Sequence, residues 1–283
     1  MPMLHSMGQM LNFGDTGAGT PVMALHGSAS TGAQWRSLAE LLAPRHRVLT
    51  PDLAGYGRSG RPAAPRTMAT EAGFLRPLLE DTGETVHLVG HSFGGAVALA
   101  VAITMPERVR SLTLFEPAAF RLLTGGDHTD AELGAEIAAV AKAIREEAQE
   151  GARAAATARF IDYWNGPGAF ARSSARLQDF ALSALDRVID NFAALAAPGL
   201  TRLALERIGC PTLVVAGLET PLPALRTAEI VAETIPGARF ELVAGAGHML
   251  PLTDPHLVDP TIARALARAE ARPERTAEPA LAA

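Results

Sequence analysis

The chain has 283 residues, of which 48% are hydrophobic and 19% are charged, a composition typical of a globular chain with a large core. Its 25 Lys and Arg against 30 Asp and Glu give a net charge of −5. This balance argues against nucleic acid and anionic membrane surfaces as partners, because both attract clustered basic side chains. The single cysteine, Cys210, excludes an intrachain disulfide and a thiolate metal cage.

The first ten residues lack the basic start and the long apolar stretch of a secretory signal. No run of the sequence reaches the roughly 20 apolar residues that a membrane-spanning helix needs. With one cysteine and neither kind of segment, we expect a cytoplasmic protein.

Short apolar runs alternate along the chain with helical patterns. Most of them show no polar alternation, as expected of parallel strands that are buried on both faces. They cover residues 22–26, 47–51, 85–90, 109–116, 211–217 and 239–243. This order predicts an α/β fold with a mostly parallel central sheet flanked by helices.

Residues 121–207 interrupt this alternation. They are rich in alanine, carry charges at helical spacing and contain no strand candidate, so we expect several helices inserted between two strands as a lid. The core then comprises residues 1–120 and 208–268. Residues 269–283 contain two prolines and no apolar periodicity, which predicts a disordered tail.

A candidate nucleophile follows the third apolar run. The stretch Gly90-His-Ser-Phe-Gly94 lies between this run and a helical pattern, which is the setting of a nucleophile elbow. In such a turn a serine is exposed in a strained conformation, and the flanking glycines remove Cβ atoms that would collide with neighbouring backbone. Ser92 is therefore the expected nucleophile.

A serine hydroxyl needs a base, and the base needs an orienting carboxylate. Of the histidines downstream of Ser92, His248 stands in a glycine-rich loop after the last predicted strand, where a ring can lie over the sheet edge. His128 lies in a polar loop and His256 follows a proline, so both suit the surface better. We expect His248 to be the base.

An oxyanion hole needs two backbone N–H groups. One should come from Phe93, the residue after the nucleophile. The other should come from Ser28, in the His26-Gly27-Ser28 loop that follows the first predicted strand.

These motifs, together with Asp52-Leu-Ala-Gly-Tyr-Gly-Arg-Ser59 and Gly247-His248, resemble the α/β-hydrolase superfamily. The resemblance is to its lid-bearing branch of esterases, lactonases, C–C bond hydrolases and dehalogenases. It covers about residues 10–265 apart from the lid. It implies the α/β-hydrolase fold and a Ser-acid-His triad, in that chain order.

The acid departs from the commonest family pattern. Thr220 stands at the usual acid position, after the fifth apolar run, and cannot act as a carboxylate. Glu116, at the end of the preceding strand, is where some relatives keep their acid, and Glu219 is adjacent to the usual position. We favour Glu116, because a carboxylate at the end of a buried apolar strand is costly without a partner; Glu219 stays as the alternative.

The predicted lid is rich in alanine and carries a few aromatic side chains, which indicates a pocket for a small, largely apolar substrate. The candidate pocket residues are Trp35, Tyr163, Trp164 and Met249. We expect a monomer or homodimer that binds a small-molecule substrate and has no cofactor and no metal site.

The expected function is hydrolysis of carboxylic esters or lactones through an acyl-enzyme. The same residues could serve C–C bond hydrolysis or cofactor-free perhydrolysis. A ligand-sensing protein with slow turnover is the alternative outside the enzymes.

Overall fold

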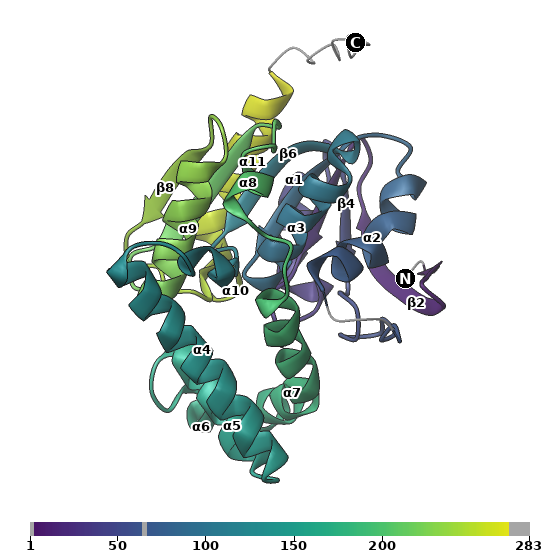
Figure 1. Cartoon of the computed structure of the whole chain (residues 1–283). Coiled ribbons are helices and arrows are strands. Elements are labelled where there is room, and N and C mark those ends of the chain that lie inside the picture. The colour runs from purple at the N-terminus through teal and green to yellow at the C-terminus, as the bar shows by residue number, and fades with distance from the viewer. Residues whose placement is uncertain (1–2, 64–66, 272–283) are drawn as a thin grey trace.

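The computed structural model describes residues 3–63 and 67–271. Its centre is an eight-stranded sheet of order β1-β2-β4-β3-β5-β6-β7-β8 (Figure 1). Strands β3 to β8 run parallel to one another, and β2 is antiparallel both to β4 and to its hairpin partner β1. The strands are β1 Met3–Ser6, β2 Gln9–Thr16, β3 Thr20–Leu25, β4 His46–Pro51, β5 Val86–His91, β6 Val109–Phe115, β7 Thr212–Gly217 and β8 Arg239–Val243.

Helices cover both faces of the sheet, which explains the continuous apolar runs of the central strands. Every residue of β5 and β7 is buried. One face packs on α1 (Arg36–Leu42) and α11 (Pro255–Glu270), and the other packs on three more helices. These three are α2 Met68–Asp81, α3 Phe93–Thr104 and α9 Leu222–Thr234. The core also contains four shorter helices, η1 Gly32–Trp35, η2 Pro106–Arg108, η3 Phe120–Leu123 and α10 Leu250–Thr253.

The predicted fold class is confirmed, and the six predicted strands correspond to β3–β8 with ends that differ by at most two residues. The sequence patterns did not reveal β1 and β2. These two strands lie at one side of the sheet, and β2 contains Asn12, Gly14 and Asp15, so neither shows the apolar run of a strand buried on both faces.

Between β6 and β7 the chain forms helices and no strand over residues 128–205, which we call the helical insertion. It contains α4 His128–Gln149, α5 Arg153–Asn165, α6 Ala169–Arg172, α7 Ala175–Ala196 and α8 Arg202–Leu205. Most of this segment projects away from the sheet on one side (Figure 1). At the other end of the chain, α11 extends through Glu270, so the expected disorder from residue 269 is wrong at its start; residues 272–283 lie outside the described residues.

A buried ion pair joins the helical insertion to the core. Arg187 of α7 donates from Nη2 to Glu71 Oε1 of α2 at 2.6 Å and from Nε to the carbonyl of Ala54 at 2.5 Å. The side chains of Arg187 and Glu71 are only 4% and 2% exposed. Since both charges have lost most of their hydration, each depends on the other for compensation.

Replacing Glu71 with Ala should therefore lower the free energy of unfolding by about 3–5 kcal/mol, because the guanidinium would stay buried without its nearest carboxylate. Urea unfolding followed by circular dichroism measures this change. Arg153→Ala is a suitable control, because its ion pair with Asp186 is exposed and such pairs contribute about 1 kcal/mol or less. Equal losses in the two variants would contradict the importance of the buried pair.

Candidate active site

Ser92 occupies a strained turn between β5 and α3. Its backbone has φ 52° and ψ −118°, a conformation that non-glycine residues rarely adopt. A Cβ on Gly90 would lie 2.7 Å from the carbonyl oxygen of Gly94, and one on Gly94 would lie 2.3 Å from the carbonyl oxygen of Leu25. The two glycines thus allow the sharp turn that presents the Ser92 hydroxyl at the carboxyl end of the sheet.

His248 brings an imidazole to this hydroxyl from the loop after β8. Its Nε2 lies 3.0 Å from Ser92 Oγ, and its side chain is 2% exposed. The ring of Trp164, from α5 of the helical insertion, stacks on it with centroids 4.1 Å apart and planes inclined by 28°.

The Glu116 carboxylate binds the other ring nitrogen of His248. Its Oε2 lies 2.6 Å from His248 Nδ1 and also accepts a 2.6 Å hydrogen bond from Thr220 Oγ1. Its Oε1 accepts from the amide of Gly217 at 2.7 Å. Thr220, at the usual acid position, therefore holds an acid that comes from the neighbouring strand. Glu219 is exposed and makes no hydrogen bond to His248.

Like Ser92, Glu116 has a positive φ, of 44°. Its amide donates to the carbonyl of Val215 on β7 at 3.0 Å, which extends the pairing of β6 and β7 by one residue. The local turn directs the side chain across the end of β7, toward the loop after β8 that carries His248.

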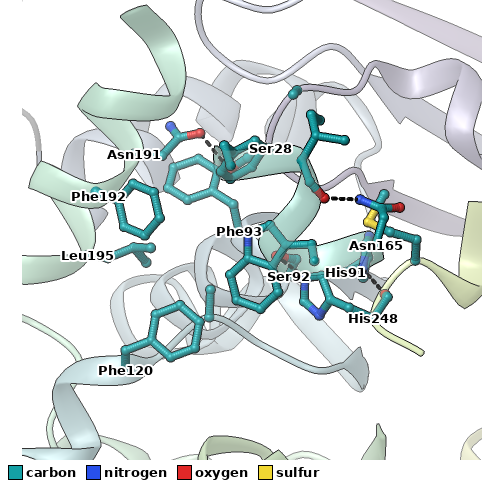
Figure 2. A pocket seen from close by; sticks show the side chains of 17 residues that line it. Ser28, His91, Ser92, Phe93, Phe120, Asn165, Asn191, Phe192, Leu195 and His248 are labelled. Carbon is teal, nitrogen blue, oxygen red and sulfur yellow. Dashed lines mark hydrogen bonds between the residues drawn. The ribbon is translucent and has the colours of Figure 1, made fainter. Parts of the chain in front are cut away.

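Ser28, in the loop after β3, and Phe93, the first residue of α3, line one pocket together with Ser92, and the backbone amides of Ser28 and Phe93 are the expected oxyanion donors. Neither donates a hydrogen bond to another group within the part of the chain that the structure describes. The Ser28 hydroxyl donates to Asn191 Oδ1 of α7 at 2.8 Å, so the helical insertion also holds this loop (Figure 2). His26 braces the loop by accepting from the amide of Leu53 at 2.9 Å.

A pocket of about 50 Å³ lies in front of Ser92. Its walls are mostly apolar side chains from α3, η3 and the helical insertion (Figure 2). The apolar lining side chains include Phe93, Phe120, Phe160, Ile161, Trp164, Phe192, Leu195 and Met249.

Two of the four expected pocket residues, Trp164 and Met249, line this pocket, and the other two do not. Trp35 is 1% exposed and packs in the core between the sheet and α1. Tyr163 packs edge-on against Trp164 and donates from its hydroxyl to Glu136 at 2.7 Å. The prediction that Trp35 and Tyr163 line the pocket was therefore wrong, because the position of a residue in the sequence does not fix the direction of its side chain. Asn191 belongs to no sequence motif, so its contact with Ser28 could not be predicted from the sequence.

Within residues 3–63 and 67–271, no group of three His, Cys, Asp or Glu side chains is arranged to hold a metal ion. No helix in the same ranges is long and apolar enough to cross a membrane.

The sequence profile of the alpha/beta hydrolase fold matches residues 20–255. This match covers most of the chain, and the sheet order and the strained turn at Ser92 agree with it. The chain therefore belongs to the α/β-hydrolase fold family.

The chain is also similar to particular members of this family. It is 42% identical over 115 residues to 2-hydroxymuconate semialdehyde hydrolase from Pseudomonas sp., a match that covers 36% of this chain and 38% of that protein. The aligned segment thus spans less than half of this curated relative.

Two solved structures align over nearly the whole chain. An α/β hydrolase from Sphaerobacter thermophilus has a TM-score of 0.75 at 23% identity and covers 94% of this chain and 100% of its own. An esterase from Thermogutta terrifontis has a TM-score of 0.67 at 26% identity and covers 92% and 94%.

Several buried histidines make stability sensitive to pH. Burial lowers the pKa of His26 to about 4, the pKa of His87 to about 4, and the pKa of His91 well below its ordinary value. All three rings are therefore neutral at pH 7 in the folded chain.

Because the unfolded chain takes up these protons first, below about pH 6.5, the free energy of unfolding should fall as the pH drops toward 4. His26 and His87 should each contribute a loss of about 2 kcal/mol between pH 7.5 and pH 5, and His91 acts in the same direction. Urea titrations at the two pH values measure the change, and His87→Gln should reduce it. An unfolding free energy that is the same at both values would contradict this linkage.

Proposed function

We propose that this chain is a serine hydrolase that cleaves small carboxylic esters or lactones through an acyl-enzyme. The observation that supports it best is the continuous chain of hydrogen bonds from Ser92 Oγ through His248 to Glu116, at 3.0 Å and 2.6 Å. A nucleophile, a base within hydrogen-bond reach and a third group that orients the base form the arrangement that activates a hydroxyl.

In this mechanism Glu116 accepts a hydrogen bond from the protonated Nδ1 of His248. The lone pair of Nε2 is then directed at Ser92. As Ser92 Oγ attacks the carbonyl carbon, Nε2 takes the hydroxyl proton and then delivers it to the leaving oxygen. Glu116 stabilises the imidazolium that forms. In the second half, Nε2 takes a proton from water as the water oxygen attacks the acyl carbon, and then gives that proton to Ser92 Oγ as the acyl bond breaks. The carboxylic acid leaves and the serine hydroxyl is regenerated.

The negative charge that develops on the carbonyl oxygen needs donors that are already in place. The amides of Ser28 and Phe93 have no other acceptor in the described ranges, so they are available to this oxygen. Asn191, by holding the Ser28 hydroxyl, would keep one of these amides in position.

The size and lining of the pocket favour a small substrate. A buried water needs about 10–15 Å³ of such space, so a pocket of about 50 Å³ holds the equivalent of a few waters, or a short acyl chain. None of the described residues that line it is a lysine or an arginine. An uncharged ester or lactone therefore suits the site better than a substrate with a free carboxylate.

We further propose that residues 121–207 act as a lid. Phe160 and Trp164 of α5 and Phe192 and Leu195 of α7 form one wall of the pocket, so substrate entry would require some displacement of these helices.

C–C bond hydrolysis is the second candidate, since 2-hydroxymuconate semialdehyde hydrolase is among the relatives. The same triad could serve it, but an acidic dienoate would bring a carboxylate to a pocket without a lining cation. Activity on p-nitrophenyl acetate or a small lactone, together with inactivity on a ring-cleavage dienoate, would favour ester hydrolysis.

Ser92→Ala should abolish both turnover of p-nitrophenyl acetate and labelling by a fluorophosphonate, because no other hydroxyl is paired with His248 in the described chain. Intact-protein mass spectrometry shows the label directly. Labelling that persists in the variant would place the nucleophile elsewhere.

Glu116→Gln should lower kcat by about 10³–10⁴, because an amide can no longer fix the imidazole tautomer or stabilise its cation. Glu219→Gln, which removes only an exposed charge, is the matched control and should stay near the wild type. Steady-state kinetics, measured on variants whose circular dichroism spectra match the wild type, shows which of the two glutamates is the acid. The reverse ranking would assign the acid to Glu219.

A further inference from the structure

A second chain of hydrogen bonds joins Gly27 and His91, the neighbours of Ser28 and Ser92, to the backbone of His248. The amide of Gly27, next to Ser28, donates to Gln34 Oε1 at 3.1 Å. Gln34 Nε2 lies 3.1 Å from His91 Nδ1, and His91 is next to Ser92. His91 Nε2 lies 2.8 Å from the carbonyl oxygen of His248, as Figure 2 shows.

The direction of every bond in this chain follows from its two ends. A backbone amide can only donate, so the oxygen of the Gln34 side chain faces Gly27 and its NH₂ group faces His91. A backbone carbonyl can only accept, so His91 Nε2 carries the proton and Nδ1 offers its lone pair to Gln34. The sequence of donors and acceptors is consistent throughout and requires a neutral His91.

The surroundings of His91 suit this role. The ring is fully buried, and this burial lowers its pKa well below the ordinary value, so the neutral form persists. Gly27 provides the space, since a Cβ there would lie 2.9 Å from His91 Nδ1. Gln34 is 7% exposed, so water competes little for its hydrogen bonds.

We propose that Gln34 and His91 are positioning residues. They fix the loop of Gly27 and Ser28, and the loop that carries His248, relative to the nucleophile elbow at Ser92. Three segments meet at the site: Gly27 precedes Ser28, His91 precedes Ser92, and the third contact is the carbonyl of His248 itself. His91 holds the His248 loop through the backbone carbonyl of His248, so this contact does not occupy the ring nitrogen that faces Ser92. This inference rests on the proposed hydrolase function.

The geometric demand is strict, because displacing a reacting group by about 1 Å can cost about 100-fold in rate. Loss of the His91 bond would remove a contact that holds the backbone of the loop at His248. Substrate binding depends mainly on the apolar walls of the pocket, so the effect should appear in kcat more than in KM.

The test compares His91→Leu, His91→Gln and Gln34→Leu. His91→Leu removes both bonds and should lower kcat for p-nitrophenyl acetate by about 10–100-fold, with KM within about threefold of the wild type. His91→Gln can place a donor near the position of Nε2 and should restore most of the lost kcat. Gln34→Leu should resemble His91→Leu, and the double variant should be no worse than the poorer single variant, because the residues act as one unit.

His87→Leu is the matched control. His87 lies four residues earlier on the same strand, is equally buried and bonds to Ser111, away from the site. The His87→Leu variant should be less stable than the wild type but have the same kcat. A kcat for folded His91→Leu that equals the wild type, a kcat for His91→Gln as low as that for His91→Leu, or an equal kcat loss in His87→Leu would each overturn the proposal. If His91→Leu does not fold, Gln34→Leu against the wild type decides by the same criteria.

The rate of fluorophosphonate labelling at Ser92 is measured on every variant. Wild-type labelling without turnover of any ester or lactone would contradict the proposed substrate class alone, and the labelling rates would then decide the positioning role. A wild type that neither hydrolyses nor labels would overturn both proposals.

Discussion

The buried carboxylate of Glu116 is the acceptor on which the arrangement of the site depends. It receives hydrogen bonds from the Gly217 amide, the Thr220 hydroxyl and the His248 ring, and its side chain is completely buried. A carboxylate in such surroundings is tolerated only when donors surround it. The three donors come from the end of β7, from the loop after β7 and from the loop after β8, so the hydrogen bonds to this one charge also join the last two strands to β6 at the edge where Ser92 lies.

Backbone strain at the site is supported by the sheet. Ser92 and Glu116 both have positive φ, and each directly follows a strand of the buried parallel core. The Ser92 amide donates to the carbonyl of Phe115 at 2.9 Å, which links the two strained turns to each other. Unfavourable conformations of this kind cost on the order of 1–3 kcal/mol each and persist where the surrounding structure fixes them. The parallel pairing of β5, β6 and β7 provides that support.

The helical insertion completes the site from outside the sheet. Arg187 attaches α7 to the core through a buried ion pair, Asn191 holds the loop that carries Ser28, and Trp164 stacks on the base. A movement of these helices would therefore change the exposure of the pocket and the surroundings of His248 together. The lining of the pocket and the surroundings of His248 thus depend on the same segment.

The sequence by itself determined the parts of this protein that local patterns encode. The apolar runs marked the six parallel strands, since burial on both faces leaves a continuous signal, and the glycines around Ser92 marked the elbow, since only they allow its turn. The tertiary structure decided what depends on contacts between distant residues. Glu116 lies 104 residues from Thr220 and 132 from His248, and Trp35 and Tyr163 could not be separated from Trp164 as pocket residues until the packing fixed their directions. The physical reason is that a hydrogen bond or a pocket wall between remote segments depends on how the strands and helices are placed in space, and no short stretch of sequence carries that placement.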